Sequence, residues 1–257
     1  MSVAPKKSLG QHFLVDENIL GVVGRLSDLA PDDVVLEIGP GLGVLTRFLA
    51  DRVRFVHAVE LDRSLESALL DSLGVRTNVG LVWGDALRLA VDELDPAPGK
   101  LVSNLPYNIA TPLVVETLEH AATLTRWCVM VQREVADRFF ASPRTKAYGA
   151  VSVLVQLAAR KVGFHPVPPT VFRPPPRVDS ALVAFERNAT VPIARVRGVV
   201  EAAFAHRRKT IANSVALTGL ASRGSVEEAL VSVGLSARAR AEELEPRAFV
   251  ELADALR

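Results

Sequence analysis

The stretch that decides the fold class reads Val34-Val35-Leu36-Glu37-Ile38-Gly39-Pro40-Gly41-Leu42-Gly43. Its first five residues form a short, mainly apolar run of the kind that buried parallel strands show. Three glycines follow in the spacing G-x-G-x-G, and a helical pattern of apolar residues begins at Leu45. A strand, a glycine turn and a helix are typical of the opening of a nucleotide-binding α/β unit. The glycines allow close backbone approach, and the helix N-terminus offers free N–H groups.

Three further strand-like runs end in polar or glycine residues. The runs and the residues that follow them are 55–59 with Glu60, 79–83 with Gly84-Asp85, and 101–102 with Asn104. Ligands bind at the carboxyl ends of the strands in open α/β sheets, so the sequence predicts a binding site at this edge. An acidic side chain at the position of Glu60, 23 residues beyond Glu37, can accept both hydroxyls of a ribose.

Two other kinds of site are not supported by the sequence. The glycine spacing differs from the G-x-G-x-x-G of dinucleotide folds, and no residue is a plausible proton-transfer group, which argues against a nicotinamide dehydrogenase. His120 has no Cys, Asp or His nearby at ligand spacing, so we expect it to be structural and predict no metal site.

The alternation of strands and helices continues to about residue 185 and then stops. Helices are expected near 16–26, 112–122, from 133 onwards and at 148–157, and strands near 127–131, 162–164 and 181–185. After residue 191 only helical patterns remain, near 193–205, 207–216, 225–233 and 246–256. We therefore predict an α/β domain at residues 1–189, with a distinct N-terminal segment at 1–15, and a small all-α domain at residues 190–257.

The composition fits a soluble protein of the cytoplasm. The net charge is +1, and no uncharged run approaches the ~18 residues that a membrane span needs. The single cysteine, Cys128, lies in an apolar run, which indicates a reduced and buried thiol rather than a nucleophile.

Basic residues form separate islands instead of a general excess. The islands are Lys6-Lys7, Arg173 with Arg177, and His206-Arg207-Arg208-Lys209. If folding gathers them on one face, they form a phosphate-binding surface. Each can equally be a solvated surface cluster, and the sequence leaves both interpretations open.

Seven motifs carry a resemblance to a known family. They are Gly10-Gln11-His12-Phe13-Leu14, Glu37-Ile38-Gly39-Pro40-Gly41-Leu42-Gly43, Glu60-Leu61-Asp62, Gly84-Asp85-Ala86, Asn104-Leu105-Pro106-Tyr107-Asn108, Phe172-x-Pro-x-Pro-x-Val-x-Ser180 and Arg207-Arg208-Lys209-Thr210. In this order they resemble the ribosomal RNA adenine dimethyltransferases over nearly the whole chain. Within that family the similarity is to members that dimethylate two adjacent adenosines near the 3′ end of small-subunit ribosomal RNA.

The resemblance implies a class I methyltransferase fold, with a Rossmann-like, seven-stranded, mostly parallel sheet, and S-adenosylmethionine as methyl donor. It assigns to the cofactor His12, Leu14, Gly39, Gly41, Glu60, Leu61, Asp85, Ala86 and Asn104. In this assignment the glycines admit the methionine part, Glu60 holds the ribose hydroxyls, and Asp85 accepts from the adenine amino group. His12 and Leu14 close over the cofactor, although family members often have Asn at the position of His12.

The resemblance also implies how the acceptor base is held. An adenine N6 lone pair is delocalised into its ring, so the site must favour the tetrahedral amine that exists during attack. Asn104 Oδ1 and the carbonyl of Leu105 or Pro106 can each accept one N6 hydrogen. Tyr107 is expected to stack on the flipped-out base, with Phe172, in the proline-rich stretch 166–176, as a candidate for the other face. No metal and no strong general base are required.

The expected partner is small-subunit ribosomal RNA or an immature small subunit, bound by a monomer. The predicted RNA-binding residues are Lys6, Lys7, Arg173, Arg177, Arg207, Arg208 and Lys209. Two alternatives remain open: a large-subunit RNA adenine methyltransferase that confers macrolide resistance, and a mainly non-catalytic ribosome assembly factor.

Overall fold

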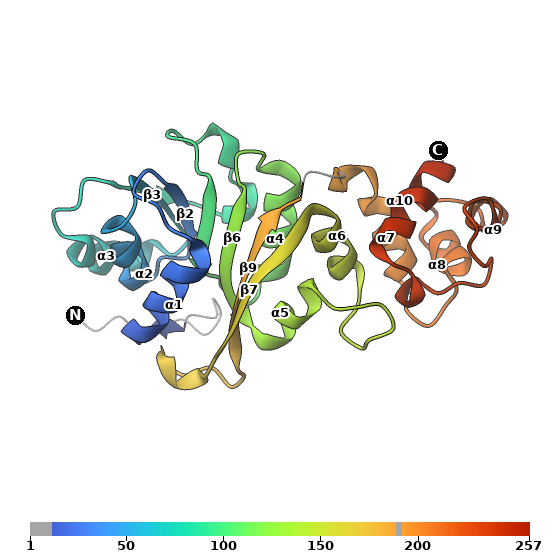
Figure 1. Ribbon diagram of the computed structural model, residues 1–257. Helices are drawn as coiled ribbons and strands as arrows, with labels where there is room; N and C mark the ends of the chain where they lie inside the picture. Colours follow the sequence, from blue (N-terminus) through green and yellow to red (C-terminus); the bar gives the residue numbers. More distant parts are fainter. Residues whose placement is uncertain (1–11, 189–191) are drawn as a thin grey trace. The chain divides into compact units, whose positions relative to one another are not determined.

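The computed structural model describes residues 12–188 and 192–257 and divides into two compact units (Figure 1). The first unit comprises the chain up to Ala136 together with Arg160–Arg187. The second unit comprises Asp137–Ala159 and the chain from Asn188 to Arg257. The predicted glycine turn lies in the first unit.

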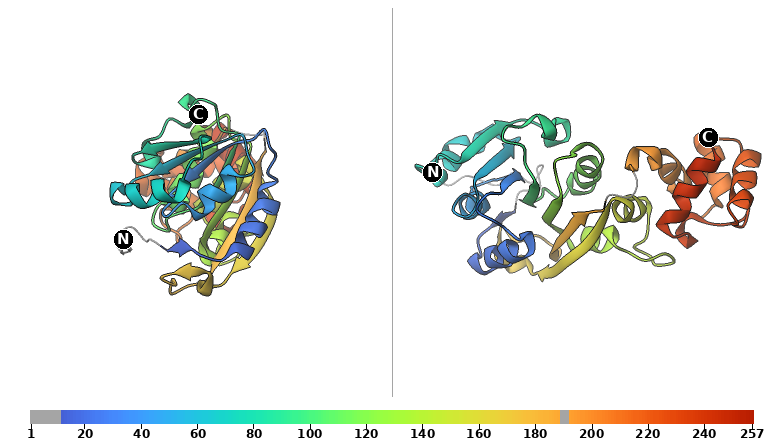
Figure 2. Two further views of the ribbon diagram at one scale, coloured as in Figure 1. Left: turned by 90° about the vertical axis from the view of Figure 1, so that its left-hand side faces the viewer. Right: turned by 45° about the horizontal axis from the view of Figure 1, so that its top comes forward.

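A seven-stranded sheet forms the centre of the first unit, in the order β4-β3-β2-β5-β6-β9-β7 (Figures 1 and 2). Its strands are β2 (Val34–Ile38), β3 (Phe55–Glu60), β4 (Val79–Trp83), β5 (Lys100–Asn104), β6 (Arg126–Gln132), β7 (Ala159–Val167) and β9 (Ser180–Arg187). The pairs β2–β3, β3–β4, β2–β5 and β5–β6 are parallel, and β9 is antiparallel to β6. The prediction of a seven-stranded, mostly parallel sheet is confirmed.

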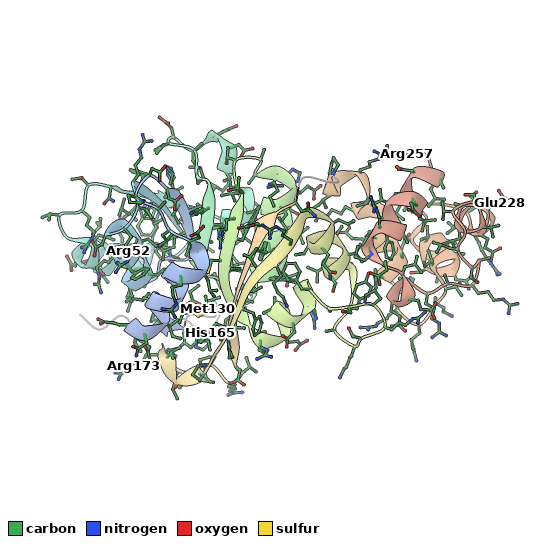
Figure 3. The ribbon with its side chains drawn as sticks, viewed as in Figure 1. Arg52, Met130, His165, Arg173, Glu228 and Arg257 are labelled. Atoms are coloured by element: carbon green, nitrogen blue, oxygen red, sulfur yellow. The ribbon has the colours of Figure 1, made fainter. Side chains whose placement is uncertain are left out.

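Helices pack on the sheet through apolar side chains. They are α1 (Glu17–Ser27), α2 (Val44–Ala50), α3 (Glu66–Leu73) and α4 (Ala110–His120). Asp16 caps α1 as predicted, and this helix contacts β5, β6 and β9. One buried cluster contains Val23 of α1 together with Cys128 and Met130 of β6. Met130 is labelled in Figure 3. Cys128 is buried, which confirms its predicted position, and this burial raises the pKa of its thiol to about 11.

A two-stranded antiparallel sheet pairs β1 (Phe13–Leu14) with β8 (Phe172–Arg173). Next to it, the Val15 N–H donates to the Val171 carbonyl at 2.9 Å. The first described residues therefore lie along the proline-rich stretch 166–176. This places the N-terminal segment against a part of the chain that is about 160 residues away in sequence.

Helices make up the second unit. They are α6 (Ala150–Ala158), α7 (Arg197–Phe204), α8 (Ile211–Thr218), α9 (Arg223–Ser232) and α10 (Pro246–Ala255), and α5 (Arg133–Phe139) leads into it. The predicted helix at 207–216 begins later, because Thr210 is its N-cap and its side chain accepts the Asn213 N–H. Arg207-Arg208-Lys209 consequently lie in the turn before the helix.

The compact units differ from the expected domains, whose boundary lay between residues 189 and 190. Residues 137–159 pack with the C-terminal helices, and α6 contacts both α7 and α10. Tyr148 is buried there and donates its hydroxyl hydrogen to the Leu244 carbonyl at 2.7 Å. Sequence order alone placed this stretch with the strands that flank it.

Among the described residues no helix is long and apolar enough to cross a membrane. Within the same residues, no group of three or more His, Cys, Asp or Glu side chains is arranged to hold a metal ion. His120 lies near Glu116, 3.4 Å from its carboxylate on the exposed side of α4.

Arg187, at the end of β9, closes the C-terminal end of α4. Its guanidinium donates to the carbonyls of Leu118, Ala121 and Leu124 at 2.7–2.9 Å, and its Cζ lies 5.1 Å from the centre of the Trp127 ring. A cation at this position satisfies carbonyls that a helix leaves unpaired and complements the negative end of the helix dipole. Arg187 thus joins the last strand to the helix that follows the Asn104 motif.

We expect Arg187→Ala to lower the free energy of unfolding by about 2–4 kcal/mol, because three carbonyls lose a charged donor. Urea titrations followed by circular dichroism measure the effect. The exposed Arg54 offers a matched control, and Arg54→Ala should change the same quantity by less than about 0.5 kcal/mol. Equal losses in the two variants would contradict a capping role.

Candidate active site

A pocket opens at the carboxyl ends of β2, β3, β4 and β5 in the first unit. Its wall is formed by residues within 12–14, 37–45, 59–65, 84–86 and 104–109. All nine residues that the sequence assigned to a cofactor line it, and so do Leu105, Pro106 and Tyr107. Side chains from five separated segments therefore meet at the predicted edge of the sheet.

The glycine turn adopts a backbone that only glycine accepts easily. Gly39, Gly41 and Gly43 have φ angles of 73°, 59° and 75°. A Cβ on Gly41 would lie 3.0 Å from the Phe13 ring, and one on Gly39 would lie 3.3 Å from the Pro106 ring. Positive φ and close approach together explain the glycines. The turn exposes backbone to the pocket and is held between the N-terminal segment and the Asn104 motif.

Glu60 ends β3 and is almost completely buried. One carboxylate oxygen accepts the Gly41 N–H at 3.2 Å, and the other accepts the Asp62 N–H at 2.8 Å. Each oxygen can accept another hydrogen bond, so the carboxylate can hold the glycine turn and still bind two hydroxyl groups. This geometry fits a ribose.

Leu61 and Asp85 form the more open part of the pocket. Leu61 is 59% exposed although it is large and apolar, so it offers an apolar contact surface to a ligand. Asp85 accepts the Leu87 N–H at 3.0 Å through one oxygen, and its other oxygen lies 3.9 Å from the Arg88 guanidinium. The carboxylate retains acceptor positions for an amino group.

Asn104 is oriented by the N-terminal segment. Its Nδ2 donates to the His12 carbonyl at 3.1 Å, so Oδ1 is left as the amide's acceptor. The two carbonyls considered beside it differ. The Pro106 carbonyl already accepts the Ile109 N–H at 3.1 Å, whereas the Leu105 carbonyl accepts no hydrogen bond from the described residues. The structure therefore favours Leu105 over Pro106 as the second acceptor.

Tyr107 is held at its hydroxyl and along its ring. The hydroxyl hydrogen-bonds the buried Ser180 Oγ at 2.6 Å. The ring stacks with that of His12, with the ring centres 5.6 Å apart and the planes 30° from parallel. Burial raises the pKa of the Tyr107 phenol above its ordinary value. A neutral, fixed aromatic ring thus borders the Asn104 amide.

The structure does not support the expected contact between Phe172 and a base. The Phe172 side chain is 1% exposed, belongs to the core cluster, and does not line the pocket. It pairs with Leu14 in the β1–β8 sheet, so turning it toward a ligand would open both the sheet and the core. The proline-rich stretch is a wall, as expected, but its aromatic ring faces inward.

With this geometry established, comparisons with known proteins identify the family. A sequence model described as "Ribosomal RNA adenine dimethylase" matches residues 3–257.

The chain belongs to the ribosomal RNA adenine dimethylase family.

Its similar relatives cover nearly all of the chain. "Ribosomal RNA small subunit methyltransferase A" of Rubrobacter xylanophilus is 49% identical over 250 residues, which cover 96% of this chain and 94% of that protein. The protein of the same description from Kineococcus radiotolerans is 43% identical, over 98% of this chain and 86% of that protein. The predictions of family, methyltransferase activity and S-adenosylmethionine as cofactor are confirmed.

Two solved structures resemble the chain closely. A dimethyladenosine transferase from Plasmodium falciparum has a TM-score of 0.78 and 22% identity, over 94% of this chain and 96% of that chain, which shows the shared fold. The 23S rRNA methyltransferase ErmE has a TM-score of 0.67 and 31% identity, over 95% of this chain and 99% of that chain. The predicted fold class is confirmed.

The predicted RNA-binding residues of this dimethylase lie in different parts of the chain. Lys6 and Lys7 fall outside the described residues. Arg173 (labelled in Figure 3) and Arg177 are exposed in the first unit, and Arg207, Arg208 and Lys209 are exposed in the second. These five side chains are all accessible to solvent.

Sequence reasoning missed two further basic residues, Arg144 and Lys146, which flank Thr145. The Thr145 carbonyl accepts the Arg207 guanidinium at 3.3 Å, and the Arg144 N–H donates to the Glu242 carbonyl at 2.7 Å. These contacts place the loop beside the Arg207 island of the second unit. No local pattern could have shown this, because about 60 residues separate the two segments.

Sequence reasoning also missed the state of Glu37, although it quoted the residue within the glycine motif. Its side chain is buried on β2, and Oε2 has no hydrogen-bond partner among the described residues. Burial raises its pKa to about 8, the Glu60 charge adds to the rise, and nearby Thr46 opposes it. The Thr46 hydroxyl makes no hydrogen bond to the described residues either, so it lowers the Glu37 pKa only as a nearby polar group.

We expect Glu37 to make the stability of this dimethylase fall as pH rises. The folded chain keeps the Glu37 proton up to pH about 8, whereas the unfolded chain releases it near 4.5. The unfolded state therefore binds fewer protons between these values, and Glu37 costs on the order of a few kcal/mol by pH 8. Glu37→Gln should remove this loss, which urea titrations from pH 5 to 8.5 measure.

The exposed Glu93 serves as the control. Glu93→Gln should leave the pH dependence of the unfolding free energy parallel to that of the unchanged protein. If Glu37→Gln also gives a parallel curve, Glu37 is ionised in the folded protein at neutral pH and the expectation is wrong.

Proposed function

We propose that this chain transfers methyl groups from S-adenosylmethionine to N6 of two adjacent adenosines near the 3′ end of small-subunit ribosomal RNA, as part of small-subunit maturation. The observation that carries the proposal is the Asn104 amide, whose Nδ2 donates to the His12 carbonyl so that Oδ1 remains an acceptor, in the wall of a ribose-compatible pocket. The Leu105 carbonyl, which accepts no hydrogen bond from the described residues, belongs to the same wall. The relatives named as small-subunit enzymes, at 37–49% identity, support this substrate.

The pocket residues fit the parts of the cofactor. The backbone at Gly39 and Gly41 receives the methionine part, and the Glu60 carboxylate accepts the ribose hydroxyls. Asp85 accepts from the adenine amino group, while Leu61 and Ala86 pack against the adenine ring. When bound, the cofactor supplies an electrophilic methyl group on a positively charged sulfur. His12 and Leu14 cover the pocket from the N-terminal side.

The acceptor residues act by positioning. Asn104 Oδ1 and the Leu105 carbonyl each accept one hydrogen of the adenine N6 amine, which favours the tetrahedral form and directs the lone pair toward the methyl group. Tyr107 stacks on the base, and its bond to Ser180 fixes the position of its hydroxyl end. Alignment of this kind accounts for up to about 7–11 kcal/mol in well-oriented reactions. After the first transfer the amine has one hydrogen left, so only one of the two acceptors binds it during the second transfer.

Methylation of large-subunit RNA is the second candidate, because the 23S rRNA methyltransferase ErmE shares 31% of its residues with this chain. The higher identity to the small-subunit relatives favours the first candidate. A purely non-catalytic assembly role is less well supported, because such a role does not require the open acceptors beside the pocket. We further propose that the enzyme acts in the cytoplasm as a monomer.

RNA is proposed to contact the basic surfaces of both units. In the second unit the surface comprises Arg144, Lys146, Arg207, Arg208 and Lys209, with Glu242 paired to Arg207 at 3.1 Å. In the first unit Arg173 and Arg177 have the same proposed role. The same role is proposed for Lys6 and Lys7, which lie outside the described residues. Phosphate contacts of this kind do not depend on base sequence.

We expect the chain to restore N6,N6-dimethylation of small-subunit RNA in a bacterial strain that lacks its own enzyme. Primer extension and mass mapping of the modified adenosines measure the outcome. Asn104→Ala should fail to restore it, because one N6 hydrogen loses its acceptor, while RNA binding persists. Dimethylation that appears in the large subunit instead would overturn the choice of substrate, and full activity of Asn104→Ala would overturn the acceptor role.

We expect the double change Arg207→Ala with Arg208→Ala to weaken RNA binding and to reduce its salt dependence. Loss of up to two phosphate contacts lowers the slope of log K against log salt by roughly 1–2. Binding titrations with small subunits over a range of salt concentrations measure the slope. The exposed pair Arg52 and Arg54 in the first unit, both changed to alanine, provides the control. An unchanged slope in the test variant would show that the two arginines are merely solvated.

A further inference from the structure

Residues 12–15 form a strap across the pocket that is tied to the proline-rich stretch at every residue. His12 lies beside Pro174, Phe13 pairs with Arg173, Leu14 pairs with Phe172, and the Val15 N–H donates to the Val171 carbonyl. Phe13 contacts the glycine turn and His12 contacts the Asn104 motif. One short segment therefore contacts both the glycine turn and the Asn104 motif.

The geometry points to His12 as a positioning residue for methyl transfer, acting on Asn104 through its main-chain carbonyl and on Tyr107 through its ring. The effect of His12 on methyl transfer rests on the proposed function, whereas its contacts with Asn104 and Tyr107 do not. It goes beyond a role for His12 in covering the cofactor. In this role His12 orients the residues that hold the N6 amine of the target base.

The carbonyl contact decides which way the Asn104 amide faces. An amide has a donor end and an acceptor end, and rotation by 180° exchanges them. The His12 carbonyl can only accept, so it binds the Nδ2 end and leaves Oδ1 as the acceptor. In the reversed orientation two oxygens would face each other and an N–H group would face the N6 hydrogens. The strap thus selects the orientation that methyl transfer requires.

The ring contact fixes the plane of Tyr107. His12 Nδ1 lies 2.8 Å from the Pro174 carbonyl, and a carbonyl only accepts, so Nδ1 carries the hydrogen. This bond holds the imidazole against one face of the Tyr107 ring. With the hydroxyl bonded to Ser180, the phenol is held at its tip and along one face. In this inference the target base stacks on the opposite face.

Fluorine spectroscopy tests the ring contact directly, because the chain has only two tyrosines, Tyr107 and Tyr148. Full-length protein labelled with 3-fluorotyrosine should give two signals, and Tyr107→Phe assigns them by removing one. His12→Ala should shift or broaden the Tyr107 signal and leave Tyr148, in the second unit, unchanged. His12→Phe keeps an aromatic ring but loses the bond to Pro174, so its effect should be intermediate.

The second experiment measures the rate of single-turnover methyl transfer to small subunits. Cofactor and substrate are both saturating, so that weaker binding in a variant does not change the measured rate. His12→Ala should slow transfer by roughly 10–100-fold, since small misplacement at a reacting centre has effects of this size. The matched control is His165→Ala, which removes a half-buried histidine of β7 outside the pocket (labelled in Figure 3). It should leave both the rate and the Tyr107 signal unchanged.

The carbonyl contact is tested by Asn104→Asp. This change keeps an oxygen at the acceptor position and replaces the donor by an oxygen that repels the His12 carbonyl. The strap should then move, and the Tyr107 signal should change as it does in His12→Ala, without any substrate present. An unchanged Tyr107 signal in Asn104→Asp would overturn the carbonyl half of the inference.

The outcomes separate this inference from the proposed function. An unchanged Tyr107 signal in His12→Ala, or a transfer rate equal to or above that of His165→Ala, overturns the positioning role. A failure of the unchanged protein to methylate small-subunit RNA overturns the proposed function instead, and the fluorine signals still report whether His12 holds Tyr107. Circular dichroism of each variant confirms that the fold is retained.

Discussion

The parallel pairing of β2 with β3 on one side and with β5 on the other is the constraint on which the site depends. It brings the carboxyl ends of these strands to one edge, so that Glu60, the glycine turn and Asn104 border the same pocket. Strand ends leave the sheet ladder and their side chains are free to meet a ligand, while the strands themselves are locked in the core. The remaining features of the pocket refine this arrangement.

The two buried carboxyl groups beside the pocket differ in their hydrogen bonding. Two carboxyl groups, Glu37 and Glu60, lie under the glycine turn, and only Glu60 has both of its oxygens bonded to backbone N–H groups. Glu37 avoids the cost of a second buried charge by keeping its proton to a pH of about 8. A buried carboxyl of this kind reduces stability as the pH rises toward 8.

The acceptor side is built from contacts that are distant in sequence. The Asn104 amide meets the His12 carbonyl, the Tyr107 hydroxyl meets Ser180, and the His12 ring meets Pro174. Each contact restricts the position of a group that we propose to align with the methyl donor. In the proposed mechanism, orientation by these hydrogen bonds takes the place of a strong base. The second unit has its own such contact, where Tyr148 ties residues 137–159 to the helices near Leu244.

The sequence by itself determined the fold class, the order of the strands' polar ends and the residues of the pocket. The fold class and the edge that carries the pocket depend on local patterns: apolar runs, the glycine spacing, and an Asn-x-Pro-Tyr stretch directly after a strand. Individual pocket residues such as His12, Leu61 and Ala86 were implied by the resemblance to the family. Tertiary structure alone decided that Leu105 and not Pro106 has the free carbonyl, that Phe172 faces the core, and that residues 137–159 pack with the C-terminal helices. It also decided the state of Glu37 and the contacts of His12. The physical reason is the same throughout, because hydrogen-bond partners, burial and desolvation are set by groups that lie far away along the chain.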